Sequence, residues 1–248
     1  MSGRVQGPVL ILGAASDMAR AVARGFAARG CAIQLAARDP ARLEADKADL
    51  ETRFGVAVSL HAVDALDVGS HAAFVASLPD LPHVAVCAIG LMGDQAENAA
   101  DMTRAALILR SNFEGPASLM GALATAMEAR GSGTLVGISS VAGERGRASN
   151  YVYGSAKAGF TAYLSGLRNR LAKRGVHVVT VLPGFVATKM TEGMDLPARL
   201  VAEPEEVARA IVAAVEKSRD IIHVRRIWWL IMAIIKAIPE AIFKKTSI

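Results

Sequence analysis

Short apolar runs alternate with longer alanine-rich stretches along most of this chain. The apolar runs are four to seven residues long and mostly hydrophobic, which is typical of strands buried on both faces of a parallel sheet. The stretches between them place apolar residues at helical spacing. The pattern predicts strands at 9–12, 32–37, 57–61, 84–89, 134–138, 177–182 and 221–224. It predicts helices at 18–29, 105–129, 153–174 and 205–217, and a further helix after Asp39-Pro40, where Asp39 is a plausible N-cap.

This alternation indicates the α/β class, with a Rossmann-type doubly wound parallel sheet covered by helices on both faces. No linker-like or low-complexity break precedes residue 223. We therefore expect a single dinucleotide-binding and catalytic domain over residues 1–223. An apolar, basic, helical tail would follow at 224–248. Binding sites are expected at the carboxyl ends of the strands.

Composition narrows the class of protein. Of 248 residues, 52% are hydrophobic, so the chain can bury a substantial core. The net charge of +5 is uneven, because the tail alone carries +4 and leaves about +1 for the first 223 residues. A nucleic-acid-binding surface is therefore not indicated. Residues 1–8 are polar and lack the apolar stretch of a secretion signal, which favours a cytoplasmic protein. The cysteines and histidines show no ligand spacing, so no metal is expected.

The chemistry of the chain is concentrated around Tyr153 and Lys157, which stand four residues apart on a predicted helix. Positions i and i+4 share one helix face, so the ammonium can lie beneath the phenol. A nearby cation favours the phenolate and would lower the tyrosine pKa from about 10. Such a tyrosine can act as acid or base beside a carbonyl or alcohol. Ser140 precedes Tyr153 by 13 residues, at the end of an apolar run.

The first predicted strand ends at Gly13 and leads into the first predicted helix. There, helix N-terminal amides favour a pyrophosphate. A plain strand-to-helix turn is the alternative. In this context we expect the segment to bind a nucleotide through Gly13, Ser16, Asp17 and Met18.

With these motifs, residues 8–223 resemble the short-chain dehydrogenase/reductase family. The family's glycine motif is Thr-Gly-x-x-x-Gly-x-Gly, and this chain has Leu12, Gly13, Asp17 and Ala19 at those places. The replacements leave the turn possible. An acidic side chain near the pyrophosphate would be repulsive unless Asp17 points away or caps the helix.

The resemblance also implies how the adenosine end would be held. An arginine, Arg38, follows the second strand where an acidic residue would select NAD, and a guanidinium can hold a 2′-phosphate. We therefore expect NADP(H) as the cofactor, with a solvated surface arginine as the alternative. Asp64 would meet the adenine, although a turn or N-cap role is nearly as plausible. Of the family's Asn-Asn-Ala-Gly, Gly90 alone is retained.

At the reacting end, the resemblance assigns catalytic roles to Ser140, Tyr153, Lys157 and Asn112. Ser140 would hold the substrate oxygen, and it is preferred over Ser139 because the family pattern places the active residue directly before Val-x-Gly. Lys157 would also bind the nicotinamide ribose, and Asn112 would anchor a proton-relay water. The nicotinamide carboxamide would be oriented by the segment after the sixth strand, through Pro183, Gly184, Val186 and Thr188.

The implied reaction interconverts a carbonyl and a secondary alcohol, in a direction that the sequence does not fix. Short segments resemble the branch of the family that includes a reductase of a decaprenylphosphoryl keto-sugar, which suggests a small-molecule, hydrophobic or lipid-linked substrate. A soluble 3-ketoacyl-type reductase is one alternative. An idle NADP-binding regulatory protein is another. A homo-oligomer is expected.

The tail has too few apolar residues to span a bilayer. On a helix, its isoleucines form one wide stripe opposite Lys236, Glu240 and Lys244: Ile227, Ile231, Ile234, Ile235, Ile238 and Ile242. Two interpretations stay open. The tail lies on the inner face of a membrane or covers a greasy substrate, or it packs on its own domain or a second subunit. The first predicts that residues 225–248 can be removed without unfolding the domain. Pro239 would divide the helix under either.

Overall fold

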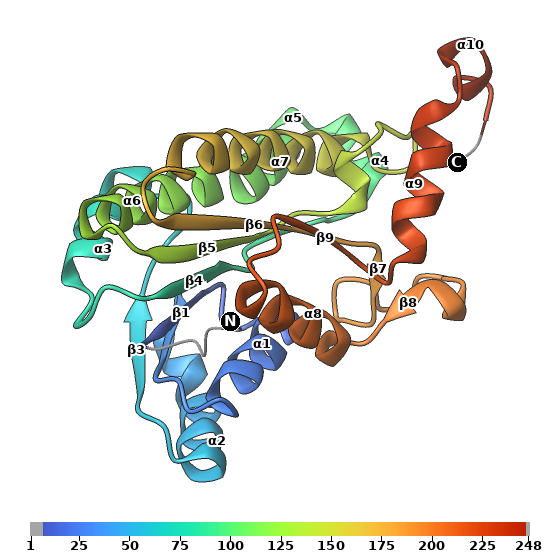
Figure 1. Cartoon of the computed structure of the whole chain (residues 1–248). Helices are drawn as coiled ribbons and strands as arrows, with labels where there is room; N and C mark the ends of the chain where they lie inside the picture. The colour runs from blue at the N-terminus through green and yellow to red at the C-terminus, as the bar shows by residue number, and fades with distance from the viewer. Residues whose placement is uncertain (1–6, 247–248) are drawn as a thin grey trace.

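A computed structural model describes residues 7–246, and its centre is a single parallel sheet (Figure 1). The strand order is β3-β2-β1-β4-β5-β6-β9, and every neighbouring pair is parallel. The strands are β1 (Val9–Leu12), β2 (Ile33–Ala37), β3 (Val58–Ala62), β4 (Val84–Cys87), β5 (Gly133–Ile138), β6 (Val176–Pro183) and β9 (Ile221–Val224). Two short strands, β7 (Phe185–Val186) and β8 (Val201–Ala202), pair apart from it. The predicted doubly wound fold is confirmed.

The central strands are buried on both faces, which explains their unbroken apolar runs. Along β1, Val9 and Ile11 enter one core cluster, whereas Leu10 and Leu12 enter the other. The strand order reverses between β1 and β4. In open parallel sheets a crevice forms at the carboxyl ends beside such a reversal, and ligands bind there.

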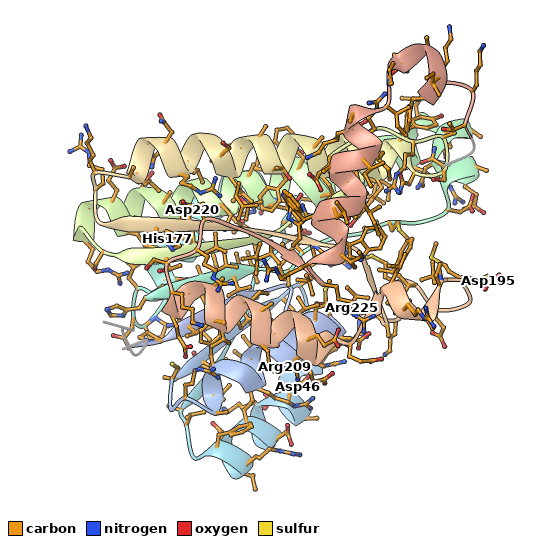
Figure 2. All side chains as sticks on the ribbon, turned by 45° about the vertical axis from the view of Figure 1, so that its right-hand side comes forward. Asp46, His177, Asp195, Arg209, Asp220 and Arg225 are labelled. Carbon is orange, nitrogen blue, oxygen red and sulfur yellow. The ribbon has the colours of Figure 1, made fainter. Side chains whose placement is uncertain are left out.

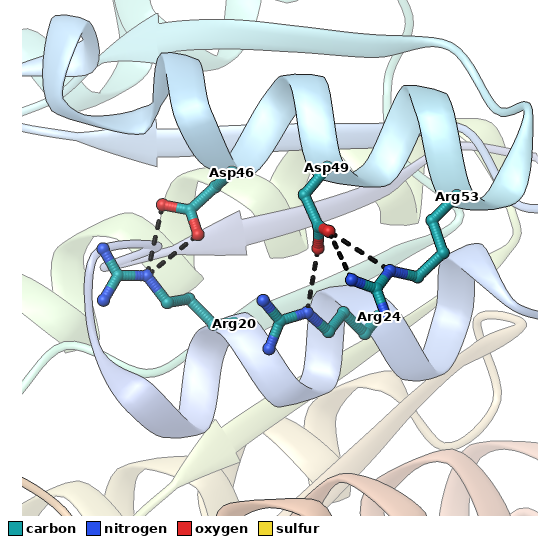
Figure 3. A network of polar contacts seen from close by, with 5 residues as sticks. All are labelled: Arg20, Arg24, Asp46, Asp49 and Arg53. Atoms are coloured by element: carbon teal, nitrogen blue, oxygen red, sulfur yellow. Dashed lines mark hydrogen bonds and ion pairs between the residues drawn. The ribbon is translucent and has the colours of Figure 1, made fainter.

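One face is covered by α1 (Asp17–Ala27), α2 (Glu44–Phe54) and α8 (Pro204–Glu216). Figure 3 shows the ion pairs that tie α2 to α1. Arg20 Nε donates to both carboxylate oxygens of Asp46 at 3.0 and 3.1 Å, and Arg24 Nε donates to Asp49 at 3.1 Å. Arg53 joins Asp49 at 2.8 Å. These pairs fix the position of α2, but exposed pairs of this kind contribute little stability.

The other face is covered by α3 (His71–Ser77), α6 (Gly115–Arg130) and α7 (Tyr151–Leu171), with α5 (Met102–Leu109) packed against α7 (Figure 1). The short helix α4 (Gln95–Ala100) lies beyond the carboxyl end of β4. Figure 2 shows the two ends of the sheet: His177 and Asp220 lie at the amino ends of β6 and β9, and Arg225 lies beyond the carboxyl end of β9.

Two predicted helices are divided in the structure. The helix expected at 105–129 is broken by a π-helical turn, Arg110–Glu114, in which Gly115 N–H donates to the Arg110 carbonyl. Pro116 lacks the N–H that would continue a regular helix, so the turn widens before α6 begins. After Asp39, a 3₁₀ turn (Pro40–Leu43) precedes α2, and Asp39 caps the Ala41 N–H at 3.2 Å.

The chain after β9 forms α9 (Ile227–Ala237) and α10 (Glu240–Phe243), divided at Pro239 as the sequence predicts. The inward face of α9 carries Trp228, Met232 and Ile235, which pack on a core cluster with Val141 and Leu182. The predicted isoleucine stripe is divided between two faces: Ile231, Ile235 and Ile238 pack on this cluster, whereas Ile227, Ile234 and Ile242 are exposed. Helical spacing cannot choose between two apolar faces.

Polar contacts also bind this segment to the domain. Lys236 Nζ donates to Glu144 at 2.5 Å, and Arg145 donates to Glu240 at 2.7 Å and stacks over the Phe243 ring. The polar side predicted for the tail thus faces the loop after β5. Within residues 7–246 no helix combines the length and apolar character needed to cross a bilayer. The expectations for residues 1–6 and 247–248 lie outside the described residues.

Candidate active site

Three adjoining cavities follow the carboxyl ends of the strands. The first, of about 310 Å³, is lined by Arg38 and Asp64, and it shares Ser16 and Gly90 with the second, of about 250 Å³. The second shares Tyr153 with the third, of about 390 Å³. The structure therefore holds one continuous trough long enough for an extended ligand, and Tyr153 stands where the second and third cavities meet.

The two serines after β5 have different surroundings. Ser139 is buried, donates to the Lys157 carbonyl at 2.9 Å and shares a hydrogen bond with Thr161 at 2.7 Å. Its hydroxyl therefore anchors β5 to α7. Ser140 lines the third cavity and caps the 3₁₀ turn Val141–Gly143, where its oxygen accepts from the Ala142 N–H at 3.1 Å. Ser140 is the serine with a hydroxyl beside the tyrosine.

The phenol of Tyr153 projects from the first turn of α7 and hydrogen-bonds the Ser140 side chain. Burial raises the pKa of Tyr153 to about 12, because the phenolate would lose its hydration, while the Ser140 hydrogen bond acts in the opposite direction. At neutral pH this side chain is therefore a protonated phenol, ready to donate a proton into the cavity.

Lys157 lies one turn further along α7 and is 3% exposed. Its Nζ donates to the Ile138 carbonyl at 3.1 Å and lies 5.7 Å from the centre of the Tyr153 ring. Burial lowers the pKa of Lys157 to about 8. The expected lowering of the Tyr153 pKa by Lys157 is not seen in this structure: burial of the phenol raises that pKa, and the Lys157 ammonium is turned toward a backbone carbonyl.

Asn112 is fully buried in the π-helical turn Arg110–Glu114. Its amide nitrogen donates to the Leu91 carbonyl at 2.5 Å and to the Ile108 carbonyl at 2.8 Å, and its oxygen accepts from the Leu91 N–H at 3.2 Å. A Cβ on Gly90 would lie 3.1 Å from the Asn112 oxygen and 3.5 Å from Lys157 Nζ. Asn112 therefore fixes the backbone at Gly90 and Leu91, which follow β4, beside the Lys157 ammonium.

The turn between β1 and α1 requires a glycine at its first position. Gly13 has φ +76°, and a Cβ there would lie 3.0 Å from the Ile89 backbone nitrogen. Ser16 caps α1 by accepting from the Ala19 N–H at 3.2 Å. Met18 lines the second and third cavities.

Asp17 points away from the turn. Its carboxylate accepts from the Lys189 backbone N–H at 3.0 Å and lies 3.9 Å from the Arg20 guanidinium. The acidic residue in place of a motif glycine thus ties α1 to the segment after β7. Repulsion of a phosphate is reduced because two hydrogen-bonding or charged partners already hold the carboxylate.

The two residues expected at the adenosine end line the first cavity. Arg38 is exposed and, among the described residues, forms no hydrogen bond or ion pair, so its guanidinium is available to a ligand. The Asp64 carboxylate accepts from the Leu66 N–H at 2.9 Å, which is the turn role that the sequence also allowed.

The segment after β6 forms one wall of the third cavity, which is lined by Pro183, Gly184, Val186 and Thr188. Thr188 also lines the second cavity, and its hydroxyl donates to the Val186 carbonyl at 3.4 Å. Gly184 lies against Trp228 of α9, where a Cβ would be 1.9 Å from the indole. The tail therefore supports this wall from behind.

Sequence reasoning missed part of the third cavity. Gln95, on α4, and Arg147, in the loop before α7, both line it, together with Met190 and Met194 beyond β7. The basic character of the loop around Arg147 was the one signal available. The position of α4 at the cavity follows from tertiary packing, and no pattern in the sequence indicated it.

The parallel sheet, the glycine turn and the serine–tyrosine–lysine set define a dinucleotide-type oxidoreductase site. A family model described as short chain dehydrogenase matches residues 8–197. The chain is 41% identical over 221 residues to an uncharacterised oxidoreductase of Mycobacterium tuberculosis, with 88% of each chain covered. The chain therefore belongs to the short-chain dehydrogenase family, which confirms the predicted family and enzyme class.

Two solved structures show the same fold. One is a short-chain dehydrogenase from Sphingobium yanoikuyae in complex with NADPH, at TM-score 0.79 and 24% identity, covering 95% of this chain and 98% of the other. The other is 3-oxoacyl-[acyl-carrier protein] reductase from Brucella melitensis in complex with NAD, at TM-score 0.76 and 26% identity, covering 90% and 96%.

Proposed function

We propose that this protein is an NADP(H)-dependent oxidoreductase that interconverts a carbonyl and a secondary alcohol, with Tyr153 as the acid/base. One observation carries the proposal: Tyr153 lines both the second and the third cavity, and its hydrogen-bond partner Ser140 lines the third. A cofactor in the trough and a substrate in the third cavity would meet beside the phenol.

The roles of the side chains follow from their contacts. Ser140 donates to the substrate oxygen, and Tyr153 delivers its proton to the same oxygen during reduction or accepts one during oxidation. When bound, the cofactor supplies or receives the hydride. Lys157 holds a positive charge below the proton path and is within reach of a ribose hydroxyl. Asn112 fixes the backbone above Lys157, in the place where a relay water would be anchored.

The residues along the trough fit a dinucleotide. The positive φ of Gly13 lets the chain turn tightly between β1 and α1, and the N-terminus of α1 offers unpaired N–H groups to a pyrophosphate. The two similar solved structures are complexes with NADPH and with NAD. Selection of NADP(H) rests instead on Arg38, an arginine without a protein partner at the end of β2, which suits a 2′-phosphate.

The substrate is proposed to be hydrophobic or lipid-linked, because much of the third cavity is apolar, with walls formed by Val141, Phe185, Met190, Met194 and Leu196. A 3-ketoacyl-type reductase is the alternative, favoured by the similarity to the Brucella melitensis enzyme. An idle binding protein is the second alternative. It does not account for a serine and tyrosine placed together in a cavity.

We further propose peripheral membrane contact on the cytoplasmic side, through the outward face of α9 and α10. This face exposes Trp229, Ile234 and Ile242 beside the basic residues Lys244 and Lys245. An apolar face flanked by lysines suits the surface of an anionic bilayer. A homo-oligomer would be the other use of the same face.

The experiment that tests the function is NADPH oxidation with a panel of aliphatic ketones and one 3-oxoacyl thioester, comparing wild type with Tyr153→Phe. The variant should lose about 10²-fold or more of its turnover while binding NADPH normally, since general acid catalysis contributes on that scale. Ser140→Ala should show a similar loss. Turnover of Tyr153→Phe within tenfold of wild type would exclude the tyrosine mechanism, and unaltered NADPH binding without turnover in wild type would favour the idle protein.

A further inference from the structure

The wall of the third cavity opposite its apolar side carries polar atoms that have no protein partner. Arg147 Nε, Gln95 Nε2 and Asn150 Oδ1 are buried and make no hydrogen bond with any described residue. Leaving a buried polar group unpaired costs about 1–3 kcal/mol. All three atoms belong to side chains that line the same cavity, so these residues hold hydrogen-bonding capacity that no described residue uses.

Arg147 is the most informative of the three. Its guanidinium forms no ion pair among the described residues, although it is partly buried. Burial lowers its pKa. The carboxylate that also lines the cavity, Asp94, is committed to the N-terminus of α4, where it accepts from the Glu97 N–H at 2.9 Å. A buried guanidinium without a counter-ion has the environment of an anion-binding side chain.

Gln95 lines the cavity and is held by one end of its amide group. Its oxygen accepts from the Val152 N–H at 3.3 Å, in the first turn of α7, which leaves Nε2 as the unpaired group. Asn150 precedes the same helix, and its side chain makes no capping hydrogen bond. The side chains that line the cavity therefore include one cation, one with an unpaired amide donor and one with an unpaired amide acceptor. Arg147 and Asn150 stand six and three residues before Tyr153 in the sequence.

From this arrangement we propose that Arg147 and Gln95 bind an oxyanion of the substrate, either a carboxylate or a phosphate, while Asn150 accepts a hydrogen bond from a neighbouring hydroxyl. The substrate is then amphipathic: its charged group lies at Arg147 and its apolar part lies against Met190, Met194 and Phe185. That its carbonyl lies at Tyr153 rests on the proposed function, but the anion site itself does not.

The test measures binding and needs no turnover. The probes are octanoate, octyl phosphate and octan-1-ol, each titrated below its aggregation limit into the protein with NADP⁺ present. Arg147→Gln should raise the Kd of both anionic probes by about tenfold or more, because hydrogen bonds to charged groups are strong, and leave the Kd of octan-1-ol unchanged. Arg42→Gln, which removes an exposed arginine outside the cavity, is the matched control and should change none of them.

The outcomes separate the two proposals. If Arg147→Gln changes all three probes equally, or the anionic probes by less than twofold, the anion site is excluded. The melting temperature of Arg147→Gln should equal or exceed that of wild type, since no hydrogen bond or ion pair to a described residue is lost, and a marked decrease would assign Arg147 a structural role instead. A preference between octanoate and octyl phosphate identifies the anion. If the anionic probes bind through Arg147 but no ketone is reduced, the proposed function fails and the anion site stands.

Discussion

Gly184 and Trp228 are in direct contact, and a Cβ atom on Gly184 would lie 1.9 Å from the indole Cε2. Gly184 belongs to the wall of the substrate cavity, whereas Trp228 is on the inward face of α9. Trp228 also packs edge-on against Phe185, with ring centres 5.2 Å apart. The cavity wall and α9 therefore form one packed unit. A shift of α9 would change the shape of the cavity.

Gly184→Ala should displace α9 from the domain. No rotamer change can relieve the overlap on the glycine side, so the indole or the backbone has to move, and overpacking of this kind destabilises by about 1–3 kcal/mol. A lower melting temperature and red-shifted tryptophan fluorescence are the expected signals. Gly166→Ala on α7 is the control, since a Cβ there meets no other atom within 4 Å, and it should be neutral or stabilising. Equal melting curves for both variants would contradict the contact.

Arg38→Asp should reverse the cofactor preference. We expect wild type to bind NADPH more tightly than NADH, because a charge-assisted contact with the 2′-phosphate contributes roughly 1.5–3 kcal/mol. The substitution should weaken NADPH binding by about tenfold or more and leave NADH binding nearly unchanged. Arg42→Asp makes the same charge change four residues away and controls for long-range electrostatics. Equal dissociation constants of wild type for NADPH and NADH, measured by titration, would rule out this role.

Lys157→Met should stabilise the protein without cofactor while removing turnover. Burial lowers the Lys157 pKa from 10.5 to about 8, so keeping the ammonium charged at pH 7 costs on the order of 3 kcal/mol of folding free energy. Between about pH 8 and 10.5 the unfolded chain binds more protons at this residue. The wild-type stability should therefore rise with pH across that window, relative to the variant.

Thermal melts at pH 7 and pH 10 check this prediction. The melting temperature of Lys157→Met should exceed that of wild type at pH 7, and the difference should shrink by pH 10. Lys173→Met, at an exposed position after α7, should show no such pH dependence. A variant less stable than wild type at pH 7 would mean that the hydrogen bond to Ile138 outweighs the desolvation of the ammonium.

The sheet was predictable because its strands are buried on both faces. The strands β1 and β9 match the predicted ranges 9–12 and 221–224, whereas β5 is one residue longer than predicted at its start and β6 is one residue longer at each end. The spacing of Ser140, Tyr153 and Lys157 likewise places all three side chains in one region, because a strand end and one helix face fix their positions. A local sequence pattern is enough to predict the relative positions of side chains when those side chains lie on one helix or at one strand end.

Features that depend on contacts between distant segments were not predictable. The Gln95 side chain lines the cavity because α4 packs at the start of α7, where Gln95 accepts a hydrogen bond from the Val152 N–H. The Asp17 carboxylate turns toward the Lys189 N–H, 172 residues later. The Tyr153 pKa rises because surrounding side chains exclude water, an effect that the neighbouring lysine in the sequence does not reveal.

Because one face of α9 packs on the domain, the proposed membrane contact has to be tested on the other face. Removing residues 225–248 would expose Leu182 and Val141 and leave Glu144 without Lys236, so the truncated protein should be less stable. This is the result expected if the tail packs on its own domain, which was one of the two interpretations of the sequence. The informative changes lie on the outward face, where Trp229 and Ile234 are 63% and 59% exposed.

Trp229→Ser with Ile234→Ser should abolish co-sedimentation with vesicles of phosphatidylcholine and phosphatidylglycerol while leaving the melting temperature unchanged. The reason is that both side chains would insert into the interface, whereas neither packs on the domain. Lys244→Gln with Lys245→Gln should weaken binding to these vesicles by about 1 kcal/mol per lysine and leave binding to neutral vesicles unaltered. Absence of wild-type protein from the vesicle pellet would exclude the membrane role. If size-exclusion chromatography then shows a dimer that Trp229→Ser with Ile234→Ser splits into monomers, the outward face is the contact between two copies of the chain.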